Sequence, residues 1–284
     1  MSLLTEETGH PVDFVLHPTD LSQAGLSAFH HALAIAIHRG AQFTLLHAAG
    51  RWSTDSWDDF PGVRETLARW REFGTTTSLE EKMRRSSVSK IEVETRDPIA
   101  ACNQYIERHQ VDMLVLATEG RSGLSRLAGA QGAEKLARES RLFTLFVPSA
   151  GRAFVSGETG EVTLRRILIP MDPETDPRPA MLRAVRTAAL LDDTSLEITL
   201  LHVGEGEGAS VTDVPQLPFC RWNAIQRQGD VAEQILALAD EMTADAIFMS
   251  TSWQKPGIGR AKGGVTEAVL SRVACTVAVV PVDV

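Results

Sequence analysis

The segment FTLLHA at residues 43–48 occurs a second time as ITLLHV at residues 198–203. Three more segments recur in the same order: PTDLS at 18–22 as PMDPE at 170–174, VDMLVLAT at 111–118 as ADAIFMST at 244–251, and FTLFVP at 143–148 as TVAVVP at 276–281. Similar segments in the same order indicate one domain written twice along the chain. Any function therefore has to be sought by comparing the two copies.

The bulk composition fits two soluble globular domains. The chain has 284 residues, of which 43% are hydrophobic and 23% charged, enough for each half to bury its own core. A net charge of −9 argues against binding nucleic acid through its phosphates. No apolar run reaches the 18 residues of a membrane span, and the acidic N-terminus does not resemble a secretion signal. We expect no membrane association and a cytoplasmic location.

Within each copy, short β-branched runs alternate with helical patterns. In the first copy we expect strands at 12–16, 42–47, 88–95, 113–117 and 144–147, and helices at 22–39, 63–87, 98–109 and 132–140. Apolar runs of five or six residues separated by helices are typical of a parallel sheet covered on both faces. The predicted fold class is α/β, with two tandem doubly wound domains, each built on a five-stranded parallel sheet.

The spacing of the repeats shows that the copies differ in length. The offset between them is 155 residues from His47 to His202 but only 133 from Asp112 to Asp245, so the second copy lacks 22 residues between its second and third strands. Glycine and proline in GEGEGASVTDVPQLPF predict that this copy lacks the helix found there in the first. We expect domains at 1–148 and 164–284. Residues 149–163 form either a plain linker or a hairpin that offers the two sheets a shared edge.

A glycine-containing loop follows the fourth strand of the first copy. It reads ATEGRSG at 117–123, and the chain enters a helix after GAQG at 129–132. Ligands of doubly wound sheets bind at the carboxyl ends of the strands, and glycines before a helix let backbone amides face a phosphate. The loop is compatible with phosphate binding, although such loops also serve as plain connections.

These segments together resemble the universal stress protein family, and the whole chain resembles two such domains in tandem. The matching stretches are PTDLS with its alanine-rich helix, LLHA or LLHV, ATEGRSGLSRL, AEKLARES and LFVP. The resemblance implies a Rossmann-like fold of the adenine-nucleotide alpha hydrolase type and an intramolecular pseudo-dimer in which strands 144–147 and 276–280 meet. It also makes a homodimer and unknown protein partners reasonable expectations.

ATP-binding members of that family carry the motif G-x2-G-x9-G-[S/T]. In the first copy, its four defined positions fall on Ala117, Gly120, Ala130 and Gln131. The resemblance implies that their backbone amides hold ATP or another adenine nucleotide, and that Arg121 and Gly123 lie in the same loop. Only one of the three glycines is kept, so the expected site is eroded.

The resemblance extends the nucleotide site to the first two strands. It implies that Pro18, Thr19 and Asp20 line the site, with Asp20 facing the nucleoside, and that Ala48 faces the adenine through its backbone. An Asx turn that caps the following helix explains Asp20 equally well.

The second copy departs further from the motif. Its equivalent positions are Ser250, Trp253, Gly263 and Gly264, and Pro256 stiffens the loop. Because an indole stands where the backbone must approach the phosphates, we expect no nucleotide there.

Other residues give weaker signals. His31 and His38 share a helix face and are expected at the surface, while WSTDSWDDF at 52–60 is either a packed loop or a docking segment. Three cysteines without a C-x-x-C pair give no metal spacing, and no catalytic motif is present, so neither metal nor catalytic residues are expected. The sequence predicts a non-catalytic stress-response module that senses adenine nucleotide in its first domain. The alternatives are a nucleotide-free interaction or scaffold protein and a weak ATPase.

Overall fold

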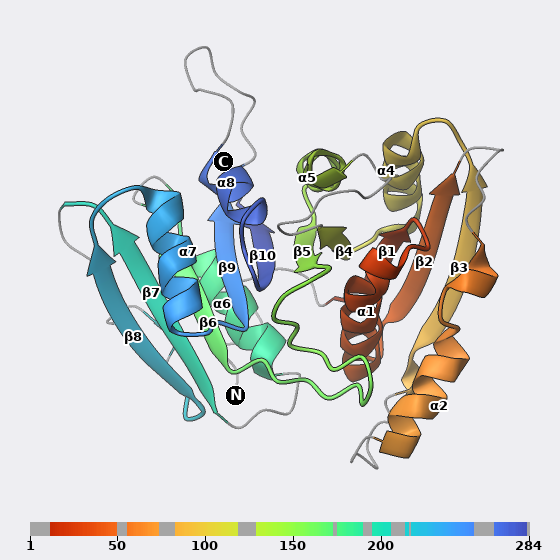
Figure 1. Ribbon diagram of the computed structural model, residues 1–284, viewed down its shortest axis with the longest axis horizontal. Helices are drawn as coiled ribbons and strands as arrows, with labels where there is room; N and C mark the ends of the chain where they lie inside the picture. Colours follow the sequence, from red (N-terminus) through yellow and green to blue (C-terminus); the bar gives the residue numbers. More distant parts are fainter. Residues whose placement is uncertain are drawn as a thin grey trace.

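The computed structural model describes most of the chain. The described residues are 12–49, 56–73, 83–118, 129–172, 175–189, 195–205, 214–215, 217–252 and 264–282. In these ranges strands and helices alternate twice along the chain, as the repeats predict (Figure 1).

The first half contains five strands. They are β1 (Phe14–Thr19), β2 (Gln42–Ala49), β3 (Ser87–Glu94), β4 (Met113–Thr118) and β5 (Phe143–Pro148). The helices between them are η1 (Gln23–Gly25), α1 (Leu26–Arg39), η2 (Trp57–Asp59), α2 (Val63–Phe73), α4 (Pro98–His109) and α5 (Gly129–Ser140). The helical region expected at 63–87 is represented by α2 and by helical residues 83–85; residues 74–82 lie outside the described part.

The second half repeats this order in a shorter form. Its strands are β6 (Arg166–Met171), β7 (Leu196–Val203), β8 (Cys220–Arg227), β9 (Ala246–Thr251) and β10 (Thr276–Pro281), and its helices are α6 (Arg178–Ala189), α7 (Val231–Glu241) and α8 (Val265–Leu270). Between β7 and β8 the described residues, 204–205, 214–215 and 217–219, are not helical. The other residues of this connection, for which we predicted the absence of a helix, lie outside the described part.

All ten strands form one continuous sheet, in the order β3-β2-β1-β4-β5-β10-β9-β6-β7-β8. Within each half the strands pair in parallel, and the halves join where β5 and β10 run antiparallel, with Leu145 opposite Ala278. The predicted meeting of the two final strands is therefore confirmed. This pairing leaves neither β5 nor β10 as an exposed sheet edge.

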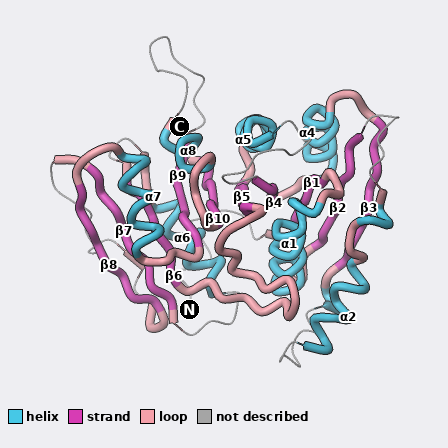
Figure 2. The backbone as a smooth tube through the Cα atoms, viewed as in Figure 1, coloured by secondary structure: helices cyan, strands magenta, loops and turns pink. Residues whose placement is uncertain are grey.

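Helices cover both faces of the sheet and bury two hydrophobic cores (Figure 2). Helices α1, α2 and α6 pack on one face, and α4, α5, α7 and α8 on the other. Neighbouring strand residues alternate between the cores: Val15 and Leu45 belong to the first, and Leu16 and Leu46 to the second. Because both faces are covered, these strands are apolar at nearly every position.

The duplicated aspartates that marked the repeat have a structural role. The Asp112 carboxylate accepts hydrogen bonds from the amides of Asp13 and Phe14 at the start of β1, both at 2.9 Å. Asp245 binds the two amides that open β6 at 2.9 and 2.7 Å. Each aspartate thus ties the first strand of its half to the loop before the fourth.

The segment that joins the halves forms a small hairpin and contacts both of them. Val155 and Val162 make an antiparallel bridge. Trp70 of α2 donates its indole N–H to the Gly157 carbonyl at 3.1 Å, and Phe154 is buried in the α1-side core. The expectation that this hairpin provides the shared edge is wrong, because β5 and β10 pair directly and the hairpin packs against the first half instead.

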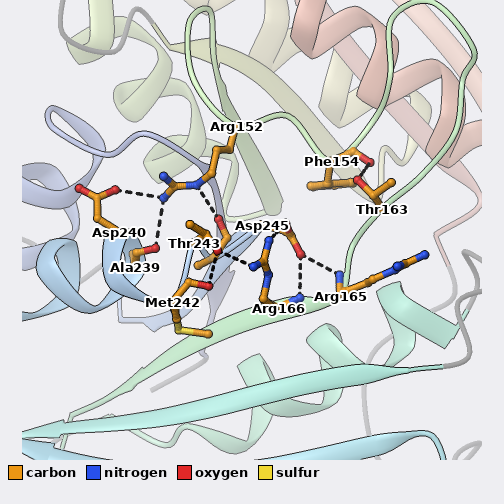
Figure 3. A network of polar contacts seen from close by, with 11 residues as sticks. Arg152, Phe154, Thr163, Arg165, Arg166, Ala239, Asp240, Met242, Thr243 and Asp245 are labelled. Carbon is orange, nitrogen blue, oxygen red and sulfur yellow. Dashed lines mark hydrogen bonds and ion pairs between the residues drawn. The ribbon is translucent and has the colours of Figure 1, made fainter.

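Just before the hairpin, Arg152 reaches the second half (Figure 3). Its guanidinium donates to the carbonyls of Ala244 at 3.0 Å and Ala239 at 3.2 Å, and to the Asp240 carboxylate at 3.1 Å. A cation suits this place, because the C-terminal end of α7 carries the negative end of the helix dipole and the Asp240 carboxylate lies beside it. The joining segment therefore connects the two halves through side chains as well as through the backbone.

Candidate functional site

The turn after β1 is shaped by two side chains of the PTDLS segment. Thr19 Oγ1 accepts from the Leu21 amide and Asp20 Oδ1 accepts from the Ser22 amide, both at 3.0 Å. Leu21 has a φ of 59°, a left-handed conformation that is unfavourable for a leucine and that these bonds help to hold. The interpretation of Asp20 as an Asx-turn residue therefore agrees with the geometry.

Strands β1 and β4 separate toward this turn. They pair only at Val15 with Met113 and Leu16 with Leu114, although both strands continue further. They mark the switch point of the half-sheet, because β2 and β3 extend from β1 in one direction and β5 lies beyond β4 in the other. Beyond the last pair, the buried His17 ring donates Nδ1–H to the Val115 carbonyl at 2.8 Å, and thereby replaces a strand-to-strand hydrogen bond.

A pocket lies at this switch point. The ends of β1 and β4, the turn after β1, the start of α4 and the first turns of α5 form its walls. Its volume is about 30 Å³. This is room for a group about the size of one or two water molecules and is far below the several hundred Å³ that enclose a whole ligand. The pocket can therefore take a substituent of a larger molecule that lies across the edge of the sheet.

Four of the predicted site residues line this pocket: Pro18, Thr19, Asp20 and Ala117. Ala48 does not line it; it lies near the end of β2, is 8% exposed and pairs with β3.

The remaining predictions fall on the phosphate loop and the helix after it. Gly120, Arg121 and Gly123 lie outside the described residues, so their positions stay predictions. Ala130 and Gln131 are in the first turn of α5, where only their backbone is described.

Sequence reasoning missed the most polar part of the pocket. His17, Ser22 and Thr118 line it, together with Cys102, whose thiol pKa burial raises to about 12. The available signal was a histidine inside the otherwise apolar strand FVLHPT, at the position where the second copy has Ile169. Burial lowers the pKa of His17 to about 4, against the opposing effects of the Val115 carbonyl and the Asp20 carboxylate.

The corresponding place in the second half is built differently. Ser250, the counterpart of Ala117, accepts a hydrogen bond from the Ala180 amide at 3.3 Å and so ties β9 to the start of α6. Asp172 accepts from the Thr175 hydroxyl at 3.0 Å. Gly264 precedes α8 as its N-cap, whereas Trp253 and Gly263 lie outside the described residues.

His47 and the described part of the 52–60 segment make structural contacts. His47 donates Nδ1–H to the Thr19 carbonyl at 2.9 Å, and its ring meets Trp57 edge-on at 5.9 Å between centroids. Trp57 also donates to Glu92 at 3.3 Å, and Phe60 is buried. The described part of the 52–60 segment, residues 56–60, therefore packs against the sheet.

The expected surface position of His31 is wrong. His31 is fully buried, donates to the Ser27 carbonyl at 2.7 Å and packs edge-on against Phe154 at 4.4 Å. Burial lowers its pKa to about 4. The sequence of α1 did not reveal this, because Phe154 is more than 100 residues away in the joining segment.

Comparison with known proteins identifies the family. The model of the Universal stress protein family matches residues 13–148 and 216–281. The chain belongs to the universal stress protein family. A search of curated protein sequences gave no significant match.

Solved structures support the same fold over nearly the whole length of this universal stress protein. A universal stress protein from Archaeoglobus fulgidus is 15% identical and matches with a TM-score of 0.58, covering 95% of this chain and 98% of its own. A protein of unknown function from Pseudomonas aeruginosa PAO1 is 14% identical with a TM-score of 0.63, covering 95% and 92%. A putative universal stress protein from P. aeruginosa UCBPP-PA14 is 14% identical with a TM-score of 0.60, covering 95% and 93%. At these identities the likeness concerns the fold alone.

Neither a metal-binding cluster nor a membrane-spanning helix is present in the described part of the chain. The described residues contain no group of three or more His, Cys, Asp and Glu side chains placed to hold a metal ion. No helix in the described part has the length and apolar content needed to cross a bilayer.

Proposed function

We propose that this universal stress protein is a non-catalytic stress-response module whose first half binds an adenine nucleotide. The observation that carries the proposal is the pocket at the switch point. Four residues that the resemblance to ATP-binding relatives assigns to the nucleotide line this pocket together: Pro18, Thr19, Asp20 and Ala117. Doubly wound sheets bind their ligands at this place, outside the carboxyl ends of the strands.

The start of α5 favours a phosphate group beside the pocket. This helix begins at Gly129, directly after the predicted phosphate loop, and its first turns border the pocket through Gly132 and Ala133. The first amides of a helix lack partners within the helix and favour an anion. A nucleotide lying across the sheet edge thus has its nucleoside near β1 and its phosphates near α5.

The second half supports a different role for its own switch point. Ser250 already occupies the start of α6 with a hydrogen bond, and Trp253 stands at a glycine position of the motif. We propose that this half binds no nucleotide and serves as the structural partner of the first half. The two halves then act as an intramolecular pseudo-dimer with one binding site.

Calorimetric titration of the purified full chain with ATP tests the proposal. We expect one equivalent of ATP to bind, and Gly120→Trp, which copies the residue of the second half, to abolish binding. Trp253→Phe is the matched control and is expected to leave the affinity unchanged. Mass spectrometry of ligand released from freshly purified protein would identify a nucleotide that is carried through purification.

Two other outcomes would replace the proposal. No binding at millimolar ATP would favour a nucleotide-free interaction protein. Phosphate release from ATP above that of Gly120→Trp would instead indicate a weak ATPase.

A further inference from the structure

The described residues at the switch points of the two halves differ in polarity, although the strand pairing there matches. β6 and β9 pair only at Ile167 with Ala246 and Leu168 with Ile247, as β1 and β4 pair at only two positions. Where the first half has His17, the second has Ile169, which is fully buried. Where α4 contributes Cys102, α7 contributes the fully buried Ile235. The fold therefore does not require a polar side chain at either position.

Three polar atoms of the first-half pocket lack hydrogen-bond partners within the described structure. They are His17 Nε2, Ser22 Oγ and Thr118 Oγ1, each with almost no solvent exposure. All three residues line the same pocket, and His17 and Thr118 are 0% and 3% exposed. Buried polar atoms are nearly always paired, because burial without a partner costs free energy. Three such atoms around one small space point to a polar group that enters it.

The chemistry of His17 restricts that group. A carbonyl only accepts hydrogen bonds, so the bond to Val115 places a hydrogen on Nδ1. The buried ring is neutral near pH 7, and its Nε2 is then an acceptor. The entering group must present an O–H or N–H donor to Nε2, while the two hydroxyls can donate to it or accept from it. An anionic oxygen does not fit, since it would face an acceptor nitrogen with the Asp20 carboxylate nearby.

We propose that His17, Ser22 and Thr118 form a selectivity subsite that accepts one neutral donor group of the bound nucleotide, either the amino group of the base or a hydroxyl of the ribose. This inference rests on the proposed function. His17 is then a specificity-determining residue, and the substitution of Ile169 at the equivalent place removes the subsite from the second half. The pocket volume, about 30 Å³, suits one such substituent.

Calorimetry of the full chain with four nucleotides tests the subsite. ITP replaces the base amino group by a carbonyl, whereas 2′-deoxy-ATP and 3′-deoxy-ATP each lack one ribose hydroxyl. We expect wild-type protein to bind ATP at least tenfold more tightly than one of these analogues, and the disfavoured analogue identifies the donor group. His17→Ile should bind ATP at least tenfold more weakly and lose that discrimination. His17→Gln, which keeps an acceptor and a donor, should restore part of both.

Two threonine variants test the subsite independently of His17→Ile, in case that variant does not fold. Thr118→Val removes one hydroxyl of the subsite with little change of shape, and Thr251→Val makes the same change at the equivalent position of β9. We expect Thr118→Val to reduce ATP affinity at least threefold and Thr251→Val to leave it unchanged. Unaltered affinity and discrimination in the His17 and Thr118 variants would overturn the subsite alone. Failure of the wild-type chain to bind any of the four nucleotides would overturn the proposed function and the subsite together.

Discussion

The two halves of this molecule share a strand order and differ in what they place at the carboxyl ends of the strands. In the first half, β1 and β4 separate around a buried histidine and a pocket that also contains the Ser22 and Thr118 hydroxyls. In the second, β6 and β9 separate at the same register around Ile169, and Ser250 binds the start of α6. The shared features hold the sheet together, as Asp112 and Asp245 do in their two halves. Duplication therefore preserved the scaffold, while the buried histidine of the first-half crevice has an isoleucine as its counterpart in the second half.

The two halves also differ in how the joining segment contacts them. Toward the first half, the segment's Gly157 carbonyl accepts a hydrogen bond from the Trp70 indole; toward the second, its Arg152 guanidinium donates to the Ala244 carbonyl.

Among the variants proposed, Gly160→Ala should cause the largest loss of folding stability, because it disturbs the packing of the hairpin on α2. Gly160 has a φ of 71°, and a Cβ there would lie 2.4 Å from the buried Trp70 ring. Left-handed strain and overpacking together predict a loss of about 2–4 kcal/mol in the free energy of unfolding, measured by urea denaturation. Gly264→Ala is the control, because a Cβ there meets nothing within 4 Å. Equal losses in the two variants would contradict the proposed packing of the hairpin.

Arg152→Ala should weaken the attachment of the second half. The variant leaves the Ala239 and Ala244 carbonyls without the charged donor shown in Figure 3. Loss of hydrogen bonds to a charged group predicts a cost of about 1.5–3 kcal/mol. Hydrogen exchange should show the faster opening in α7 rather than in α1. Arg272→Ala removes an exposed ion pair at 3.9 Å and should cost less than about 1 kcal/mol.

Exchanging the two crevice residues tests the central comparison directly. Ile169→His would bury a polar ring where the second half has an apolar one, and should cost about 1–3 kcal/mol in urea denaturation. His17→Ile should lower stability less than Ile169→His does, because it removes an unpartnered buried nitrogen. If His17→Ile lowered the free energy of unfolding more than Ile169→His, the main role of His17 would be to stabilise the fold.

Glu134 and Glu267 occupy equivalent positions in α5 and α8 and should produce a pH effect. Burial, and then the Glu267 charge, raise the pKa of Glu134 above its usual value, while Arg138 opposes them. A carboxyl with a raised pKa in the folded state contributes its stability fully below the unfolded pKa and loses it as pH rises through the folded pKa. Glu134→Gln should therefore gain stability relative to wild type as the pH rises from the ordinary glutamate pKa toward neutrality. Parallel urea midpoints for both proteins across this range would contradict the assignment.

Much of the fold was predictable because it depends on local pattern. Apolar runs such as MLVLA and FTLFV could only be strands covered on both faces, and the repeat implied one architecture twice. The turn at Asp20 was predictable for the same reason, since an aspartate two residues before an amide bonds it locally. Errors arose where the deciding contact is distant. His31 is buried by Phe154, and the hairpin lies against α2 rather than between the sheets.

The candidate site was predictable only in part, because it combines residues from separate segments. Pro18, Thr19, Asp20 and Ala117 followed from the family resemblance and line the pocket together. The role of His17 did not follow, since a histidine within a strand normally indicates nothing about a ligand. Its meaning depends on the divergence of β1 from β4 and on unpartnered atoms of Ser22 and Thr118.

The sequence by itself determined that this protein is two doubly wound domains in tandem, because periodicity and repetition are local properties of the chain. The tertiary structure decided that Arg152 reaches the second half, that the hairpin packs against α2, and that His17, Ser22 and Thr118 meet at one pocket. These features depend on contacts between residues far apart in the chain, and their free energy depends on burial, which exists only after folding.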